Sequence, residues 1–407
     1  MHFDQDETRS ADVRAAQLAE ALPRQIAHAK ADAGYFAGLL AEVDAAAVTG
    51  RQALARLPVT RKSDLMALQK PALPFGGLNA TPLSRLLRVY SSPGPIYDPE
   101  GKGRDWWRIA RALFAAGLRP GELLHNCFSY HFTPAGMMFE TAAQALECPV
   151  FPAGVGNTES QARAIHDLRP AAYAGTPSFL KIILEKAEEL GLDHGSLVKA
   201  CVSGEALPPS LRQSLADLGV AVLQCYASAD LGLIAYESQA REGMIVDEGV
   251  IVEIVRPGTG DPLPEGEVGE VVVTSLNADY PLIRFATGDL SAVLPGISPC
   301  GRSNMRIKGW MGRADQATKV RGMFVHPSQV AQVVRRHPEI LRARLVVRRD
   351  DDNDVMTLHC ETSGAGEALA SAIAGSIHAV CKLKGEVAFR LPGSLANDGL
   401  VIADERG

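Results

Sequence analysis

The sequence predicts an α/β protein whose large N-terminal domain is built on a doubly wound parallel sheet. From about residue 105, short apolar runs alternate with amphipathic segments, which is the rhythm of βαβ units. After about residue 245 the apolar runs lie closer together and are joined by turns rich in Gly and Pro, so a smaller antiparallel β region should follow. The last part of the chain mixes helix and strand patterns and predicts a small, mobile α+β C-terminal domain.

The individual elements follow from these patterns. Residues 1–60 are rich in Ala and place apolar residues at spacings of three and four, which predicts an N-terminal helical cap. We expect parallel strands in the runs LLHNCFSY, CPVFPAG, AAYAGTP, VKACVSG and VAVLQCYA, and antiparallel strands in VIVEIV, GEVVVT and PLIRF. The polar stretch at 312–322 divides two patterned regions. We therefore predict domains at 1–314 and 315–407.

Composition and charge narrow the class of protein. A chain of 407 residues with 46% hydrophobic content can bury a sizeable core, and its net charge of −6 and scattered Lys and Arg argue against a nucleic-acid partner. Seven cysteines without a CxxC pair indicate free thiols in a reducing compartment. The N-terminus is acidic, and no apolar run reaches the roughly 18 residues of a membrane helix. We expect a cytoplasmic protein with no membrane partner.

Three of the expected parallel strands end in turns of small and polar residues, at 175–178, 203–206 and 226–230. In an open parallel sheet, ligands bind beyond the carboxyl ends of the strands, where loops and helix N-termini converge. Together these turns would form a nucleotide-sized crevice with hydroxyls, carboxylates and one aromatic face. Short turns also need small residues for purely structural reasons, so that alternative stays open for each turn taken alone.

The order of these turns and of several later motifs resembles the adenylate-forming superfamily, and within it the phenylacetate-CoA ligase family. The similar segments are LPVTRKSDL at 57–65, GNTESQ at 156–161, GEVGEV at 266–271, TGD at 287–289, GRAD at 312–315 and KVRG at 319–322. The resemblance implies AMP-forming activation of a small carboxylic acid, followed by transfer to coenzyme A. It also implies ATP/AMP, Mg²⁺ and coenzyme A as cofactors and allows for a homodimer.

The resemblance assigns roles to residues of the three turns. Gly204, Glu205 and Ala206 would line the adenine, and Tyr226 would stack on it, since a flat base is held by an aromatic plane and backbone polar groups. Ser228 would also contact the nucleotide. Asp230, which stands where the family more often has Glu, would hold Mg²⁺ on the phosphates and act in catalysis.

Further roles fall on the later motifs. Asp289 would accept hydrogen bonds from the ribose hydroxyls, with Arg313 as the matching donor. An Asp after a Thr-Gly turn can also be a simple turn cap. Asp315 matches the hinge about which the small domain moves, and Lys319 would face phosphates or coenzyme A as a catalytic cation.

The segment FSYHFTPAG at 128–136 resembles the aromatic, glycine-bearing wall of the family's acyl pocket. Tyr130, Phe132 and Ala135 would line that pocket, and the aromatic rings favour an aromatic or otherwise flat acid. His131 is a candidate catalytic group, with a structural place in the wall as the alternative.

Two segments depart from the family pattern. The phosphate loop reads SSPGPIY at 91–97, so Ser91, Ser92 and Gly94 would bind ATP without the usual threonines, and each proline removes one N–H donor. Near the C-terminus, Leu400 stands at the position of the family's adenylation lysine. The leading hypothesis is a carboxylate-CoA ligase. The alternative is a degenerate protein that binds AMP or an acyl-adenylate without full ligase activity.

Overall fold

The computed structural model describes residues 1–92, 95–314, 318–321, 323–325, 327–350, 353–396 and 400–406. The chain divides into two compact units. Unit 1 comprises residues 1–252, 273–285 and 294–309, and unit 2 comprises residues 253–272, 286–293 and 310–407. The predicted division between residues 314 and 315 stays a prediction, because Asp315 lies outside the described residues.

The first half of unit 1 confirms the expected helical cap and the start of the βαβ rhythm. Its helices are α1 (Ala11–Asp32), α2 (Gly34–Leu39), α3 (Arg51–Leu54), α4 (Leu65–Gln69), α5 (Ala110–Ala115) and α6 (Ala135–Ala145). Its strands are β1 (Thr60–Arg61), β2 (Arg88–Ser92), β3 (Ile96–Glu100), β4 (Leu124–Asn126) and β5 (Val150–Phe151). β2 and β3 form a separate antiparallel hairpin.

The second half of unit 1 completes a large sheet. Its helices are α7 (Thr158–Leu168), α8 (Pro177–Glu189) and α9 (Pro209–Asp217), and its strands are β6 (Ala172–Gly175), β7 (Lys199–Val202), β8 (Ala221–Ser228), β9 (Gly232–Glu237), β10 (Met244–Val246) and β14 (Arg306–Ile307). The strand order is β14-β10-β9-β8-β7-β6-β4-β5. β5, β4, β6, β7 and β8 run parallel, and the pairs from β8 to β14 run antiparallel.

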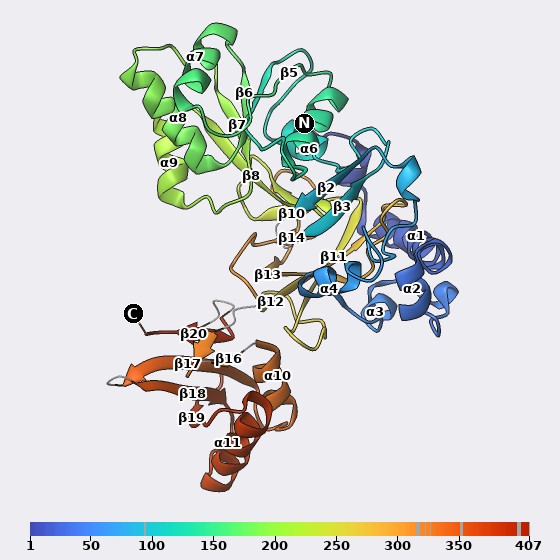
Figure 1. Ribbon diagram of the computed structural model, residues 1–407, viewed down its shortest axis with the longest axis vertical. Coiled ribbons are helices and arrows are strands. Elements are labelled where there is room, and N and C mark those ends of the chain that lie inside the picture. Colours follow the sequence, from blue (N-terminus) through green and yellow to red (C-terminus); the bar gives the residue numbers. More distant parts are fainter. Residues whose placement is uncertain are drawn as a thin grey trace. The chain divides into compact units, whose positions relative to one another are not determined.

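The parallel strands are buried on both faces, as expected for a doubly wound sheet. Tyr173, Ala200 and Val222 point into one apolar cluster with the inner sides of α7, α8 and α9. Their chain neighbours Cys201 and Leu223 point into a second cluster with α5 and α6. Figure 1 shows α7, α8 and α9 on one side of β6 and β7 and α6 on the other. The alternation of strand side chains thus explains the continuous apolar runs of the sequence.

Three strands contribute residues to both units: β11 (Val250–Val255), β12 (Val268–Ser275) and β13 (Phe285–Leu294). They are neighbours in the order β11-β12-β13. The runs VIVEIV and GEVVVT became β11 and β12, whereas the expected strand PLIRF was wrong in its bounds, because β13 begins only at Phe285, the last residue of that run. None of the helices in the described part of the chain is long and apolar enough to span a bilayer.

The C-terminal part of unit 2 has its own core. Its strands are β15 (Thr318–Val320), β16 (Met323–Val325), β17 (Arg342–Asp350), β18 (Asn353–Glu361), β19 (Glu386–Arg390) and β20 (Ile402–Asp404), and its helices are α10 (Pro327–Arg335) and α11 (Glu367–Cys381). The four-stranded sheet β19-β18-β17-β20 packs with both helices around one apolar cluster. This is the predicted α+β organisation.

Candidate nucleotide and acyl site

Three turns meet at the carboxyl ends of β6, β7 and β8, which are neighbouring parallel strands. Ser178 N donates a hydrogen bond to Glu205 Oε1 at 2.7 Å, so a carboxylate from the turn after β7 caps helix α8. Ser203 N donates to Gly175 O at 3.2 Å, and Ser203 Oγ donates to Cys225 O at 2.8 Å. The turns after β6 and β7 are therefore hydrogen-bonded to each other, and Ser203 also binds them to strand β8.

The predicted adenine segment lies at the surface of this assembly. Gly204, Glu205 and Ala206 are all exposed. Gly204 has φ of +85°, and a Cβ there would lie 3.6 Å from Thr176 Cγ2. Glycine thus permits the left-handed backbone that turns the chain over the neighbouring strand end. Tyr226 is half-buried on β8, beside a bulge between Tyr226 and Ala227 that changes the direction of the following side chains.

The turn from β8 to β9 places Asp230 in the interior. Leu231 N donates to Ser228 Oγ at 3.3 Å, which closes the turn. Gly232 lets the chain pass close to Trp107, because a Cβ at this residue would lie 2.6 Å from Trp107 O. The side chain of Asp230 is fully buried, and Lys62 Nζ lies 2.5 Å from its Oδ2.

A second carboxylate, Asp98 on β3, belongs to the same cluster. Ser92 Oγ donates to Asp98 Oδ2 at 2.8 Å, so the second serine of the predicted phosphate loop is bound to it. Burial and the neighbouring charge of Asp230 raise the pKa of Asp98 well above its ordinary value. Burial beside Asp230 therefore favours the protonated form of Asp98.

The Asp98–Asp230 cluster is the part of unit 1 with the chemistry of a Mg²⁺ site. Two carboxylates and a serine hydroxyl are hard oxygen ligands, which this ion prefers. Ser92, Asp98 and Asp230 therefore fit the metal by donor type. The described residues contain no group of three or more His, Cys, Asp or Glu side chains able to hold a metal ion, so phosphate oxygens and water would complete the shell.

The phosphate loop touches the predicted acyl segment directly. Ser91 N, at the end of β2, donates to Phe132 O at 2.8 Å. Phe132 has φ of +60°, and its ring is 80% exposed. His131 is exposed as well, and its backbone N–H and C=O are both engaged by Ser129 Oγ at 3.1 Å. Neither residue is buried in a pocket wall. Gly94 lies outside the described residues.

The inner side of the acyl segment is better ordered. Asn126 Nδ2 donates to Tyr130 Oη at 2.8 Å, and burial together with a hydrogen bond to Glu140 raises the pKa of Tyr130. Phe128 stacks on Phe139 of α6 with ring centroids 4.5 Å apart. Ala135, half-buried, begins α6. Of the residues predicted for the acyl pocket, Tyr130 and Ala135 are half-buried and Phe132 is exposed, and their role in binding the acid stays a prediction.

In unit 2, the structure brings Asp289 and Arg313 together. Their backbones form an isolated bridge, and Arg313 Nη1 lies 3.2 Å from Asp289 Oδ1. Trp310 Nε1 donates to the same oxygen at 3.1 Å. The pair predicted for the ribose thus exists as an ion pair with an aromatic donor beside it.

The C-terminal candidates are less fully described. The backbone of Lys319 lies in β15, opposite Phe324 of β16, and Asp315 falls outside the described part of the chain. Leu400 lies just before β20, where Arg344 Nε donates to its carbonyl at 3.0 Å. Lys382 and Lys384, two further cations of this domain, are both exposed.

Sequence reasoning missed Asp98 and the position of Lys62. The signal for Asp98 was a short strand, IYDPE, with two carboxylates, and such charges resemble those of an exposed edge strand. Only the hairpin register, with Tyr90 opposite Asp98, turns this side chain toward Asp230. Lys62 lay within a recognised motif, but nothing in the sequence paired it with a residue 168 positions later.

The fold agrees with that of an AMP-binding enzyme, and the comparisons with known proteins give the family. The family model of AMP-binding enzymes matches residues 116–278, which include the three turns. The phenylacetate-coenzyme A ligase of Thermus thermophilus is 33% identical over 84% of this chain and 80% of its own length. The enzyme of the same name from Pseudomonas putida is 29% identical over 88% of this chain and 84% of its own length. The chain belongs to the phenylacetate-CoA ligase family.

A solved structure supports the fold over nearly the whole chain. A 2-hydroxyisobutyryl-CoA ligase in an open conformation, in complex with 2-HIB-AMP and CoA, matches with a TM-score of 0.74. The match covers 96% of this chain and 91% of that one at 24% identity. The architecture of the adenylate-forming ligases is therefore confirmed.

Proposed function

We propose that this enzyme activates a small carboxylic acid with ATP and then forms its coenzyme A thioester. In the first step a carboxylate oxygen of the acid bonds to the α-phosphorus and pyrophosphate leaves. In the second step the coenzyme A sulfur, having lost its proton, bonds to the acyl carbon and AMP leaves. Both steps rest on positioning and on neutralising phosphate charge, so they need no nucleophile from the protein.

The observation that carries the proposal is the hydrogen-bonded junction of the three turns after β6, β7 and β8 in a chain of this family. Gly204, Glu205 and Ala206 would border the adenine, with Tyr226 stacked on it and Ser228 nearby. Asp289 would accept from the ribose hydroxyls, with Arg313 beside it.

The Asp98–Asp230 cluster would bind the Mg²⁺ ion that accompanies the ATP phosphates. Mg²⁺ would supply positive charge to the phosphate oxygens, with Asp230, Asp98 and Ser92 as its protein ligands. Ser91 would present its hydroxyl at the end of β2. Lys62, now paired with Asp230, is a cation within reach of any phosphate group that approaches this carboxylate.

The acid would lie against the inner side of the 128–136 segment. Tyr130 and Ala135 border this region, and the stacked Phe128 and Phe139 provide a flat apolar surface. These groups favour an aromatic or short branched acid. His131 and Phe132 are exposed, so a role for either depends on closure of the segment over a substrate.

The segment after residue 314 would act as a mobile small domain hinged at Asp315, with Lys319 facing phosphates or coenzyme A. The altered phosphate loop and Leu400 keep one alternative in view, a protein that binds AMP or an acyl-adenylate without full ligase activity. Family membership does not favour this alternative.

The test is thioester formation with purified protein, ATP, MgCl₂, coenzyme A and a panel containing phenylacetate, benzoate and 2-hydroxyisobutyrate. We expect an acyl-CoA product by mass spectrometry for at least one acid, and none when ATP is replaced by ADP. Binding of AMP without any thioester across a broad acid panel would support the degenerate protein instead.

Two further expectations belong to the proposal. A cytoplasmic location agrees with the seven free cysteines among the described residues. A homodimer is the expected assembly, and light scattering coupled to size-exclusion chromatography would give its mass.

A further inference from the structure

We propose that unit 1 carries a second small-molecule site, for a compact organic anion with an apolar body, in a pocket beside helix α1. The pocket has a volume of about 740 Å³ and is bordered by the N-terminal segment, α1, α3 and the chain around residue 250. We call it the N-terminal pocket and define it by Arg9, Arg14, Leu18, Arg56, Glu248 and Ile251. Its volume is in the roughly 300–1,000 Å³ range of ligand sites.

The charge of the N-terminal pocket favours an anion. Arg9 Nη2 lies 2.5 Å from Glu248 Oε2, and Arg14 contacts the same carboxylate. Two guanidinium groups therefore share one buried acid, whose side chain is only 5% exposed. The other acid near Arg9 is Asp6, at 3.6 Å and 54% exposed, where water screens it.

A further cation lies at the mouth of the pocket. Arg56 is exposed, and it makes no ion pair with any residue in the described part of the chain. Arg51, one turn earlier, also borders the pocket and donates to Val252 O at 2.7 Å. Ala11 and Ala15, in the first turns of the 22-residue helix α1, also line the pocket, and the N-terminus of this helix carries a partial positive charge. In a chain of net charge −6, this is a local excess of positive charge.

The remaining wall is apolar. Ala15 and Leu18 of α1, together with Val250, Ile251 and Leu276, present methyl and methylene groups to the pocket. A free inorganic ion would leave this surface in contact with water. In a carboxylate or phosphate attached to a small ring or short alkyl group, the anion would contact the arginines and the apolar body would cover the apolar side chains.

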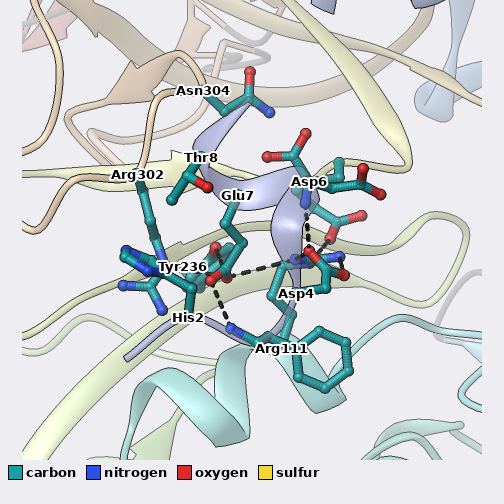
Figure 2. A network of polar contacts seen from close by, with 12 residues as sticks. His2, Asp4, Asp6, Glu7, Thr8, Arg111, Tyr236, Arg302 and Asn304 are labelled. Atoms are coloured by element: carbon teal, nitrogen blue, oxygen red, sulfur yellow. Dashed lines mark hydrogen bonds and ion pairs between the residues drawn. The ribbon is translucent and has the colours of Figure 1, made fainter. Parts of the chain in front are cut away.

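The N-terminal pocket is also held in shape before any ligand arrives. Figure 2 shows Glu7, which is fully buried, at the centre of a polar network. Tyr236 Oη donates to Glu7 Oε1 at 2.6 Å, and Arg302 Nε lies 3.1 Å from the same oxygen. Because Glu7 is two residues before Arg9, this anchor fixes the segment that supplies the arginine. A preformed site loses less conformational entropy on binding.

The experiment is isothermal titration calorimetry of the full-length protein with two probes, phenyl phosphate and benzoate, each with saturating AMP present. We expect at least one probe to bind with a dissociation constant below about 1 mM. Because benzoate is also a candidate acid for the acyl site, only binding that is lost in Ala15→Trp and kept in Ala16→Trp is assigned to the N-terminal pocket. Such binding by phenyl phosphate alone assigns a phosphate ligand, and by benzoate alone a carboxylate ligand. Failure of both probes to bind would overturn the proposal of a second site. It would leave the proposed ligase function standing, because the thioester assay tests that function separately.

Matched variants locate the binding. Ala15→Trp fills the N-terminal pocket, and Ala16→Trp places the same side chain on an exposed position of α1 outside it. Ala15→Trp should weaken binding at least tenfold, and Ala16→Trp should not. Arg56→Glu should weaken it as well, with Arg85→Glu, another exposed arginine, as its control. Equal binding by Ala15→Trp and Ala16→Trp would place the probe elsewhere and refute the site.

Discussion

At the scale of single residues, Asp289 gives the clearest prediction for nucleotide binding. Its Oδ1 accepts from Trp310 at 3.1 Å and pairs with Arg313 at 3.2 Å, so the carboxylate is already oriented. Asp289→Ala should weaken AMP binding by about 1.5 to 3 kcal/mol, the usual loss for hydrogen bonds to a charged group. Calorimetry with AMP measures this loss, and Asp12→Ala on the exposed first turn of α1 is the control. Unchanged affinity would remove Asp289 from the ribose site.

The raised pKa of Asp98 leads us to expect that the stability of the folded protein depends on pH. Its pKa in the folded protein is raised by burial and by Asp230, so the folded state holds a proton that the unfolded chain releases. Wild-type stability should therefore decrease as pH rises above about 4, the ordinary pKa of Asp. Asp98→Asn keeps a neutral hydrogen-bonding group and should avoid this loss.

Thermal unfolding of wild type and Asp98→Asn between pH 4 and 8 measures the effect. The variant should gain at least about 2 °C in melting temperature over wild type across this range. Asp64→Asn, at an exposed site, should show no such trend. A constant difference between Asp98→Asn and wild type would mean that Asp98 does not titrate differently in the two states.

Because Leu400 stands where the family has its adenylation lysine, we expect adenylation to be slow. An aliphatic side chain cannot bridge the acid's carboxylate and the α-phosphate as an ammonium group can. Leu400→Lys should raise acid-dependent ATP–pyrophosphate exchange at least about tenfold, a barrier change of about 1.4 kcal/mol. Fast exchange in wild type that is lost in Lys382→Ala or Lys384→Ala would show that one of these lysines bridges the carboxylate and the α-phosphate instead.

The residues of the candidate site and their pairings were only partly predictable from the sequence. Asp289 and Arg313 were paired in advance by resemblance, and they form an ion pair. Asp98 was not predicted, because its importance comes from Asp230, a carboxylate of the turn between β8 and β9 that lies beside it. Burial of that kind depends on long-range packing, which no local pattern encodes.

At the scale of elements, the cap of α8 links helix stability to the nucleotide turn. Glu205→Ala removes the carboxylate that accepts from Ser178 N, and should cost about 0.5 to 2 kcal/mol of unfolding free energy. Urea denaturation measures this cost. Glu188→Ala, in the last turn of the same helix, is the control and should be neutral or slightly stabilising, because a negative charge is unfavourable there. Equal destabilisation by both variants would contradict a capping role.

The elements themselves were largely predictable. The runs AAYAGTP, VKACVSG and VAVLQCYA became β6, β7 and β8, because strands buried on both faces must be apolar throughout. Less predictable was the β2–β3 hairpin, whose strand residues Asp98 and Glu100 are charged yet buried. Tyr90 Oη donates to Glu100 Oε2 at 2.6 Å, a pairing that offsets this burial only after the hairpin has formed.

At the scale of the whole molecule, we expect this enzyme to convert ATP to AMP only in the presence of an acid. The sharpest measurement is therefore product stoichiometry, with AMP, pyrophosphate and acyl-CoA quantified in one reaction containing ATP, MgCl₂, coenzyme A and an acid from the panel that supports turnover. The account predicts equal amounts of all three, with none formed when the acid is left out. Formation of ADP and phosphate, or of AMP without an equal amount of thioester, would contradict it.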